Sequence, residues 1–196
     1  MKKLDRVPTP NWLQANYKKW GKRWEVKYND PAKGSKFAWA KYNYEKVNHL
    51  LLPLLRTQTQ DHCSYCDGYP MKSRIGDTID HFRSKTQFPL LAYVWHNLFL
   101  SCHNCQQKND FFDKHLPKPD VNGYSFAYYF LFNYSTGFVV PNPRRNQADQ
   151  KRASLTIEAF GFNEFGRPED RLEVLNKYLD STNPDKDKFS YRFILS

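Results

Sequence analysis

Hydrophobic and polar positions alternate most clearly in the middle of the chain. Residues 79–82 alternate apolar and polar side chains, as one strand of a half-buried hairpin would, and residues 97–100 predict a second strand. The polar run 102–112 lacks glycine and proline, which suits a short helix. Residues 90–95 are too apolar for a solvated loop and should pack beneath these elements.

Helical spacing dominates the segment before this hairpin. Asp30 and Pro31 mark a turn, after which residues 35–59 carry apolar side chains at helical intervals. Pro53 should kink or tighten the end of that helix. Residues 11–29 mix tryptophans with lysines and arginine, which is typical of an amphipathic helix whose tryptophans enter the core.

The segment after the central hairpin predicts a second hairpin and two helices. The aromatic run 124–134 favours a strand, with a buried helix as the alternative. A turn at 135–137 would pair it with 138–140. Residues 147–159 and 168–180 have helical patterns. The expected class is therefore α+β, with mainly helical surroundings.

The length of 196 residues fits a single domain with three regions. These are a basic helical N-terminal region (1–57), a core that holds all four cysteines (58–115), and a C-terminal region with a hairpin and helices (116–196). No membrane span and no apolar leader are expected from the sequence, which favours a cytoplasmic protein.

The net charge of +10 is concentrated near the N-terminus. Residues 1–56 contain 13 Lys and Arg against 4 Asp and Glu, a surplus of nine. A basic surface with aromatic side chains suits phosphate backbones and stacked bases, so we expect an anionic partner such as nucleic acid.

The four cysteines form two Cys-x-x-Cys pairs, Cys63 with Cys66 and Cys102 with Cys105, with 35 residues between the pairs. Such pairs can turn four sulfurs toward one ion and predict a tetrahedral zinc site. Four thiolates fill the coordination sphere, so this zinc is expected to be structural. Two disulfides in a secreted protein are the alternative, and the absence of an apolar leader argues against it.

The central segment resembles an HNH endonuclease with the ββα-metal fold. The resemblance rests on Asp80-His81, on Asn97-Leu98 and on the second cysteine pair. More closely, the chain is similar to the HNH nuclease subunit of Septu and retron-associated anti-phage systems. The phrases that carry this closer similarity are residues 79–85, 88–95 and 156–163, with Arg171 after them. The fold implied is a zinc-stapled ββα-metal core embedded in a mainly helical single domain.

The resemblance also implies roles for individual residues. His81 would be the general base, Asp80 would bind a catalytic Mg²⁺ or Mn²⁺, and Asn97 would orient the His81 imidazole through a backbone hydrogen bond. The chain departs from the family at Gln106, where His or Asn is usual. Gln106 and Asn109 share a helix face, so either amide could complete the metal site. Asp110 is a further alternative for this ligand. The residues expected to bind phosphates near the site are Arg83, Lys85 and Lys108.

The function implied is metal-dependent hydrolysis of phosphodiester bonds in nucleic acid, with DNA favoured over RNA. A partner ATPase in a defence system belongs to the same expectation. The alternative is a non-catalytic zinc module that binds nucleic acid or scaffolds a protein complex. His81 discriminates the two, because a binding module does not need a general base.

Overall fold

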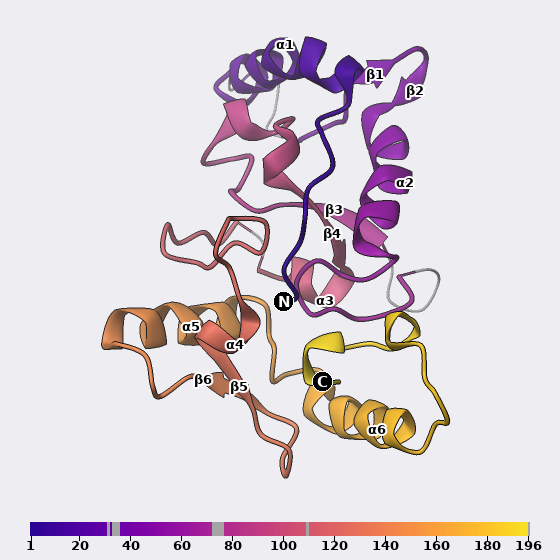
Figure 1. Ribbon diagram of the computed structural model, residues 1–196. Helices are drawn as coiled ribbons and strands as arrows, with labels where there is room; N and C mark the ends of the chain where they lie inside the picture. Colours follow the sequence, from indigo (N-terminus) through magenta and orange to yellow (C-terminus); the bar gives the residue numbers. More distant parts are fainter. Residues whose placement is uncertain (31, 33–35, 72–76, 109, 196) are drawn as a thin grey trace.

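The computed structural model describes residues 1–30, 32, 36–71, 77–108 and 110–195. Within them, helices combine with three antiparallel two-stranded hairpins, which confirms the mixed α and β class. The N-terminal helices lie at one end of the molecule, a central hairpin lies in the middle, and the C-terminal elements lie at the other end (Figure 1). No helix in the described ranges is long and apolar enough to cross a membrane.

Helix α1 (Asn11–Tyr28) is amphipathic, as expected. Its buried face carries Leu13, Trp20, Gly21 and Trp24. A Cβ added at Gly21 would lie 2.8 Å from the carbonyl oxygen of Leu90, so only glycine allows this close approach of α1 to the loop that contains Leu90.

The prediction of one helix over 35–59 is wrong for its first part. Strands β1 (Lys41–Tyr42) and β2 (Glu45–Lys46) form a small hairpin before helix α2 (Val47–Thr59) begins. Asn43 and Tyr44 both have positive φ, 47° and 67°, as a two-residue hairpin turn requires. Apolar spacing cannot report this reversal, because the turn is set by backbone conformation.

Helix α2 continues through an internal proline, Pro53. Its buried residues recur every fourth position and pack toward the central hairpin, where α2 contacts both strands. They are Val47, Leu51, Leu55 and Thr59.

The central hairpin is confirmed. Strand β3 (Asp77–His81) pairs antiparallel with β4 (Leu98–Cys102), and His81 lies opposite Leu98. The connection contains two short 3-10 turns, η2 (Pro89–Leu91) and η3 (Trp95–Asn97). The hairpin differs from the half-buried one expected, because neighbouring side chains on both of its faces are buried.

The helix after β4 is shorter than expected. Helix α3 (His103–Gln106) makes a single turn, whereas the sequence predicts a helix over 102–112. The chain leaves the helix at Gln107, and the Lys108 side chain turns inward, where its Nζ donates to the carbonyl oxygen of His81 at 3.0 Å. This inward contact is a tertiary one, which the local sequence does not encode.

The C-terminal half contains a hairpin and two helices, as expected. The aromatic segment divides into one turn of helix and a short strand, so each alternative holds for part of it. The elements are α4 (Phe126–Tyr129), β5 (Phe130–Phe132), β6 (Val139–Pro141), α5 (Gln147–Ala159), α6 (Arg167–Leu179), and the 3-10 turns η4 (Lys186–Lys188) and η5 (Arg192–Ile194).

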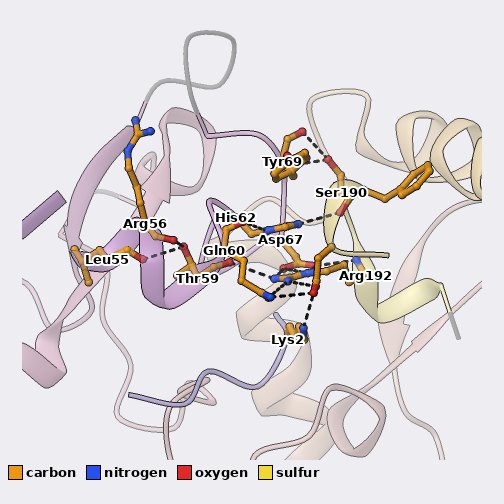
Figure 2. A network of polar contacts seen from close by, with 12 residues as sticks. Lys2, Leu55, Arg56, Thr59, Gln60, His62, Asp67, Tyr69, Ser190 and Arg192 are labelled. Atoms are coloured by element: carbon orange, nitrogen blue, oxygen red, sulfur yellow. Dashed lines mark hydrogen bonds and ion pairs between the residues drawn. The ribbon is translucent and has the colours of Figure 1, made fainter. Parts of the chain in front are cut away.

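The C-terminal segment is anchored by a buried ion pair (Figure 2). Arg192 Nη2 donates to Asp67 Oδ1 at 2.7 Å, and its Nη1 lies 2.8 Å from Asp187 Oδ1. Both Arg192 and Asp67 have side chains less than 5 % exposed (4 % and 3 %). Because Asp67 directly follows Cys66, this pair joins the C-terminal segment to the turn that holds the first two cysteines.

Candidate metal centre and adjacent cavity

The structure brings the four cysteines together. Cys63 and Cys66 lie in the turn after α2, Cys102 ends β4, and Cys105 lies in α3. All four are buried and unpaired, and their Sγ atoms lie within 4.8 Å of one another. This confirms that the two pairs converge, and the cluster could hold a metal such as zinc.

A buried arginine contacts the sulfur cluster. Arg167, at the start of α6, places Nη2 3.2 Å from Cys105 Sγ and 3.7 Å from Cys102 Sγ. Burial by itself would lower the pKa of Arg167, but the charge of the neighbouring thiolates raises it above its ordinary value. Burial raises the pKa of the Cys63 and Cys105 thiols, whereas hydrogen bonds within the cluster lower the pKa of the Cys66 and Cys102 thiols. Thiolates here therefore need positive charge, which a metal ion and Arg167 can supply together.

A second site lies toward the opposite end of the central hairpin, where His81 pairs with Leu98, whereas Cys102 pairs with Asp77. A cavity of about 270 Å³ is lined by six polar side chains from β3, the loop after it and the segment around α3. Five of the six were predicted from the sequence for the catalytic site or for phosphate binding, and Ser84 was not. The lining residues are Asp80, His81, Ser84, Lys85, Gln106 and Asp110. The predicted ligand Asn109 lies outside the described residues.

The His81 imidazole is held firmly in this site. Its Nε2 lies 2.9 Å from the carbonyl oxygen of Ala92. Trp39 stacks on the ring at a centroid distance of 5.4 Å and an angle of 20°, and Phe37 meets it edge-on at 5.5 Å. Burial, with the nearby Lys85 and Lys108 ammonium groups, lowers the pKa of His81 to about 3.

These contacts define the protonation of the ring. A carbonyl oxygen can only accept a hydrogen bond, so a neutral ring must carry its hydrogen on Nε2. The lone pair then resides on Nδ1, which hydrogen-bonds to none of the described residues. His81 thus offers a neutral nitrogen with an open lone pair in a cavity wall, and the lowered pKa makes that nitrogen a weaker proton acceptor than an ordinary histidine.

Asp80 is oriented by two donors. Its Oδ2 accepts a hydrogen bond from the Tyr65 hydroxyl at 2.6 Å and lies 3.3 Å from Lys108 Nζ. Nearby, Gln106 Nε2 donates to the carbonyl oxygen of Ile79 at 3.2 Å, which leaves the amide oxygen Oε1 for another partner. The cavity therefore contains carboxylate and amide oxygens, the ligand types that Mg²⁺ and Mn²⁺ prefer.

Within the described residues, the cavity does not contain a preformed group of three His, Cys, Asp or Glu ligands. Across the part of the chain that the structure describes, only the four cysteines form a cluster of His, Cys, Asp or Glu tight enough to share an ion. Asp110 is turned toward Ser84, whose Oγ donates to Asp110 Oδ1 at 2.7 Å. A divalent ion at Asp80 would consequently take part of its shell from water or a bound phosphate, as Mg²⁺ commonly does.

Asn97 orders the loop that follows β3. Its Oδ1 accepts from the Arg83 amide at 2.8 Å, and its Nδ2 donates to the carbonyl oxygens of Arg83 and Leu91 at 3.0 and 3.1 Å. The amide thus joins the beginning and the end of this loop. The imidazole of His81 is itself held by Ala92, so Asn97 acts on it only through the backbone.

The three expected phosphate-binding residues differ in position. Arg83 is exposed, with its guanidinium 5.5 Å from the centre of the Phe112 ring. Lys85 lines the cavity. Lys108 does not fit the prediction, because its side chain is only 1 % exposed and its ammonium pairs with Asp80. Lys108 neutralises the buried carboxylate instead of facing solvent.

Three residues of these sites escaped the sequence analysis. Tyr65 contacts Asp80, 15 residues later, and Trp39 contacts His81, 42 residues later. In the cysteine cluster, Arg167 contacts Cys105, 62 residues earlier. Of the three, only Tyr65 had a local signal, because it lies between two cysteines that are candidate metal ligands.

Compared with models of protein families and with curated proteins, the chain matches none.

Proposed function

We propose that this protein is a metal-dependent endonuclease that hydrolyses phosphodiester bonds in nucleic acid. The observation that carries the proposal is the placement of His81: its imidazole is held through Nε2 in the wall of a cavity that it shares with Asp80. This arrangement supports a general base beside a cation ligand.

In the proposed reaction, His81 Nδ1 takes a proton from water. The water oxygen attacks phosphorus, and the bond from phosphorus to the leaving sugar oxygen breaks. Asp80, with Gln106 or Asp110, would hold the Mg²⁺ or Mn²⁺. When bound, that ion supplies charge stabilisation to the phosphate and the leaving oxygen. Lys85, which lines the cavity, adds a positive charge near the phosphate.

The cysteine cluster would serve the fold in this proposal. Four thiolates complete the coordination of zinc and leave no open position for substrate. The resemblance in the sequence adds two expectations, which rest on sequence alone. The first is that the hairpin and α3 form a ββα-metal core; the second is that a partner ATPase controls the nuclease within an anti-phage system.

The test is the substitution His81→Ala. We expect divalent-ion-dependent cleavage of DNA or RNA to fall by about 10²- to 10⁴-fold, the usual contribution of a positioned base. Zinc content should stay close to wild type, and unfolding should remain cooperative at a lowered melting temperature, because the substitution removes a buried ring. The assay compares both nucleic acids with Mg²⁺ and Mn²⁺. His96→Ala is the matched control, because His96 is exposed and lies outside the cavity.

Equal cleavage by wild type and His81→Ala would reject the catalytic role. It would leave the alternative of a non-catalytic zinc module that binds nucleic acid or scaffolds a complex. The basic solvent face of α1 favours that alternative as a second candidate, since it suits a polyanion whether or not catalysis occurs.

A further inference from the structure

Tyr65 lies between the two metal-ligand cysteines of the first pair, in a turn that is fixed to the central hairpin. The amide of Asp67 donates to the carbonyl oxygen of Cys63 at 3.0 Å, which closes the turn. The amide of Ser64 donates to the carbonyl oxygen of Leu100 at 2.9 Å, which attaches the turn to β4. The backbone of Tyr65 is therefore positioned by the same turn that presents the sulfurs.

The Tyr65 ring has little freedom to move. It is fully buried, at 0 % exposure, between two aromatic rings. Phe160 stacks on it at a centroid distance of 4.1 Å, and Phe99 lies 5.5 Å away at an angle of 30°. Packing on both faces fixes the direction of the hydroxyl.

The hydroxyl points at Asp80. A carboxylate oxygen accepts hydrogen bonds, so the Tyr65 phenol is the donor in this contact. The bond to Asp80 Oδ2 is 2.6 Å long, the short distance expected for a hydroxyl donating to a carboxylate. The ammonium of Lys108 also lies 3.3 Å from Asp80 Oδ2, so the hydroxyl and the ammonium both contact this one oxygen.

The other carboxylate oxygen is free of such contacts. Oδ1 of Asp80 accepts no hydrogen bond from the residues that the structure describes, and the carboxylate lines the cavity beside His81. The two oxygens belong to one rigid, planar carboxylate group, so fixing the position of Oδ2 also fixes the direction of Oδ1.

We propose that Tyr65 is a positioning residue that aims Asp80 Oδ1 at the divalent cation, and that it thereby couples this cation site to the cysteine turn. The inference rests on the proposed function, because it assumes a cation at Asp80. Removing a residue that hydrogen-bonds to a metal ligand and orients it typically lowers metal affinity or activity by about 10- to 100-fold. Loss of zinc should have a similar effect, because the turn would no longer hold Tyr65.

The test is Mn²⁺ titration of the full chain, loaded with zinc and followed by electron paramagnetic resonance. Tyr65→Phe removes one oxygen and keeps the ring between its neighbours. We expect about tenfold weaker Mn²⁺ binding with unchanged zinc content. Tyr124→Phe is the matched control, because that buried hydroxyl donates to the carbonyl oxygen of Met1 and not to a carboxylate. This control should bind Mn²⁺ as wild type does.

Two results would overturn the inference. One is Mn²⁺ binding by Tyr65→Phe that equals wild type; the other is loss of zinc from Tyr65→Phe, which would assign the hydroxyl to the stability of the turn. Asp80→Asn separates these from failure of the proposed function. If Asp80→Asn binds Mn²⁺ as tightly as wild type, no cation binds at Asp80, and the proposed metal site is wrong whatever Tyr65 does.

Discussion

Arg167 brings a positive charge into contact with the sulfurs of the cysteine cluster. Its Nη1 donates to the carbonyl oxygens of Phe160 and Gly161, each at 2.6 Å, while Nη2 faces the sulfurs. One planar guanidinium thus serves two carbonyls and the thiolates at once. Lysine has one nitrogen and cannot reproduce this fork.

We expect Arg167→Lys to lower the free energy of unfolding by about 2 kcal/mol, because a buried carbonyl loses its donor. It should also speed the release of zinc to a chromophoric chelator. Arg171→Lys is the control: Arg171 is buried one turn later and donates to the carbonyl oxygen of Gly137 at 3.0 Å, with no contact to sulfur in the described residues. Chemical denaturation and zinc release measure the two effects. Equal zinc release by both variants would show that the sulfur contact is unimportant.

At the scale of elements, the cysteine cluster joins parts of the chain that are weak alone. Helix α3 has four residues and β4 has five, and isolated elements of that length are unstable in water. The first cysteine pair lies in a turn without a helix or strand of its own. A metal that binds all three pieces would therefore supply stability that local structure lacks.

Cys102→Ser should abolish zinc binding and cooperative folding. Structural zinc contributes roughly 10–16 kcal/mol in small zinc domains, which matches or exceeds the roughly 5–15 kcal/mol of net stability of a typical domain. Metal analysis and thermal melting followed by circular dichroism measure the loss. Ser64→Ala is the control in the turn between Cys63 and Cys66, because the Ser64 hydroxyl is buried without a hydrogen-bond partner among the described residues. An undiminished melting temperature for Cys102→Ser would argue against the metal.

At the scale of the whole molecule, helix α1 connects the basic surface to the candidate cavity. Its solvent face carries Lys19, Lys22 and Arg23, while its buried face contacts the loop after His81. Trp24 Nε1 donates to the carbonyl oxygen of Lys85 at 2.7 Å, and Lys85 lines the cavity. The N-terminal surplus of positive charge is thereby attached directly to the loop that forms one wall of the cavity.

We expect replacement of Lys19, Lys22 and Arg23 by glutamine to weaken nucleic-acid binding without sequence preference. The slope of log K against log salt concentration should become shallower by about 0.9 for each phosphate that the variant no longer neutralises. Fluorescence anisotropy at several salt concentrations measures it. The same change at exposed Lys151, Lys177 and Lys188, in the C-terminal half, is the control for net charge. Identical slopes for both triple variants would indicate that α1 is an ordinary solvated face.

The pattern of residues determined much of this protein by itself. Cysteine spacing predicted the convergence of four sulfurs, because two short Cys-x-x-Cys turns present ligands in only a few geometries. Alternation over residues 79–82 predicted β3, and residues 97–100 predicted β4. Helical patterns predicted α5 and α6, and the mixture of tryptophans and basic residues indicated α1. The strands and helices are local features, so nearby residues suffice to define them, whereas the cysteine pairs depend on a shared ion that both can bind.

Tertiary structure alone decided the rest. The hairpin at Asn43 and Tyr44 depends on backbone angles that apolar spacing does not report. Lys108 turns inward because Asp80, 28 residues earlier, needs a counter-charge once both are buried. Tyr65, Trp39 and Arg167 become site residues only through packing across distant segments. Periodicity tells which face of an element is buried, whereas the identity of the partner across that face is settled when the elements pack together.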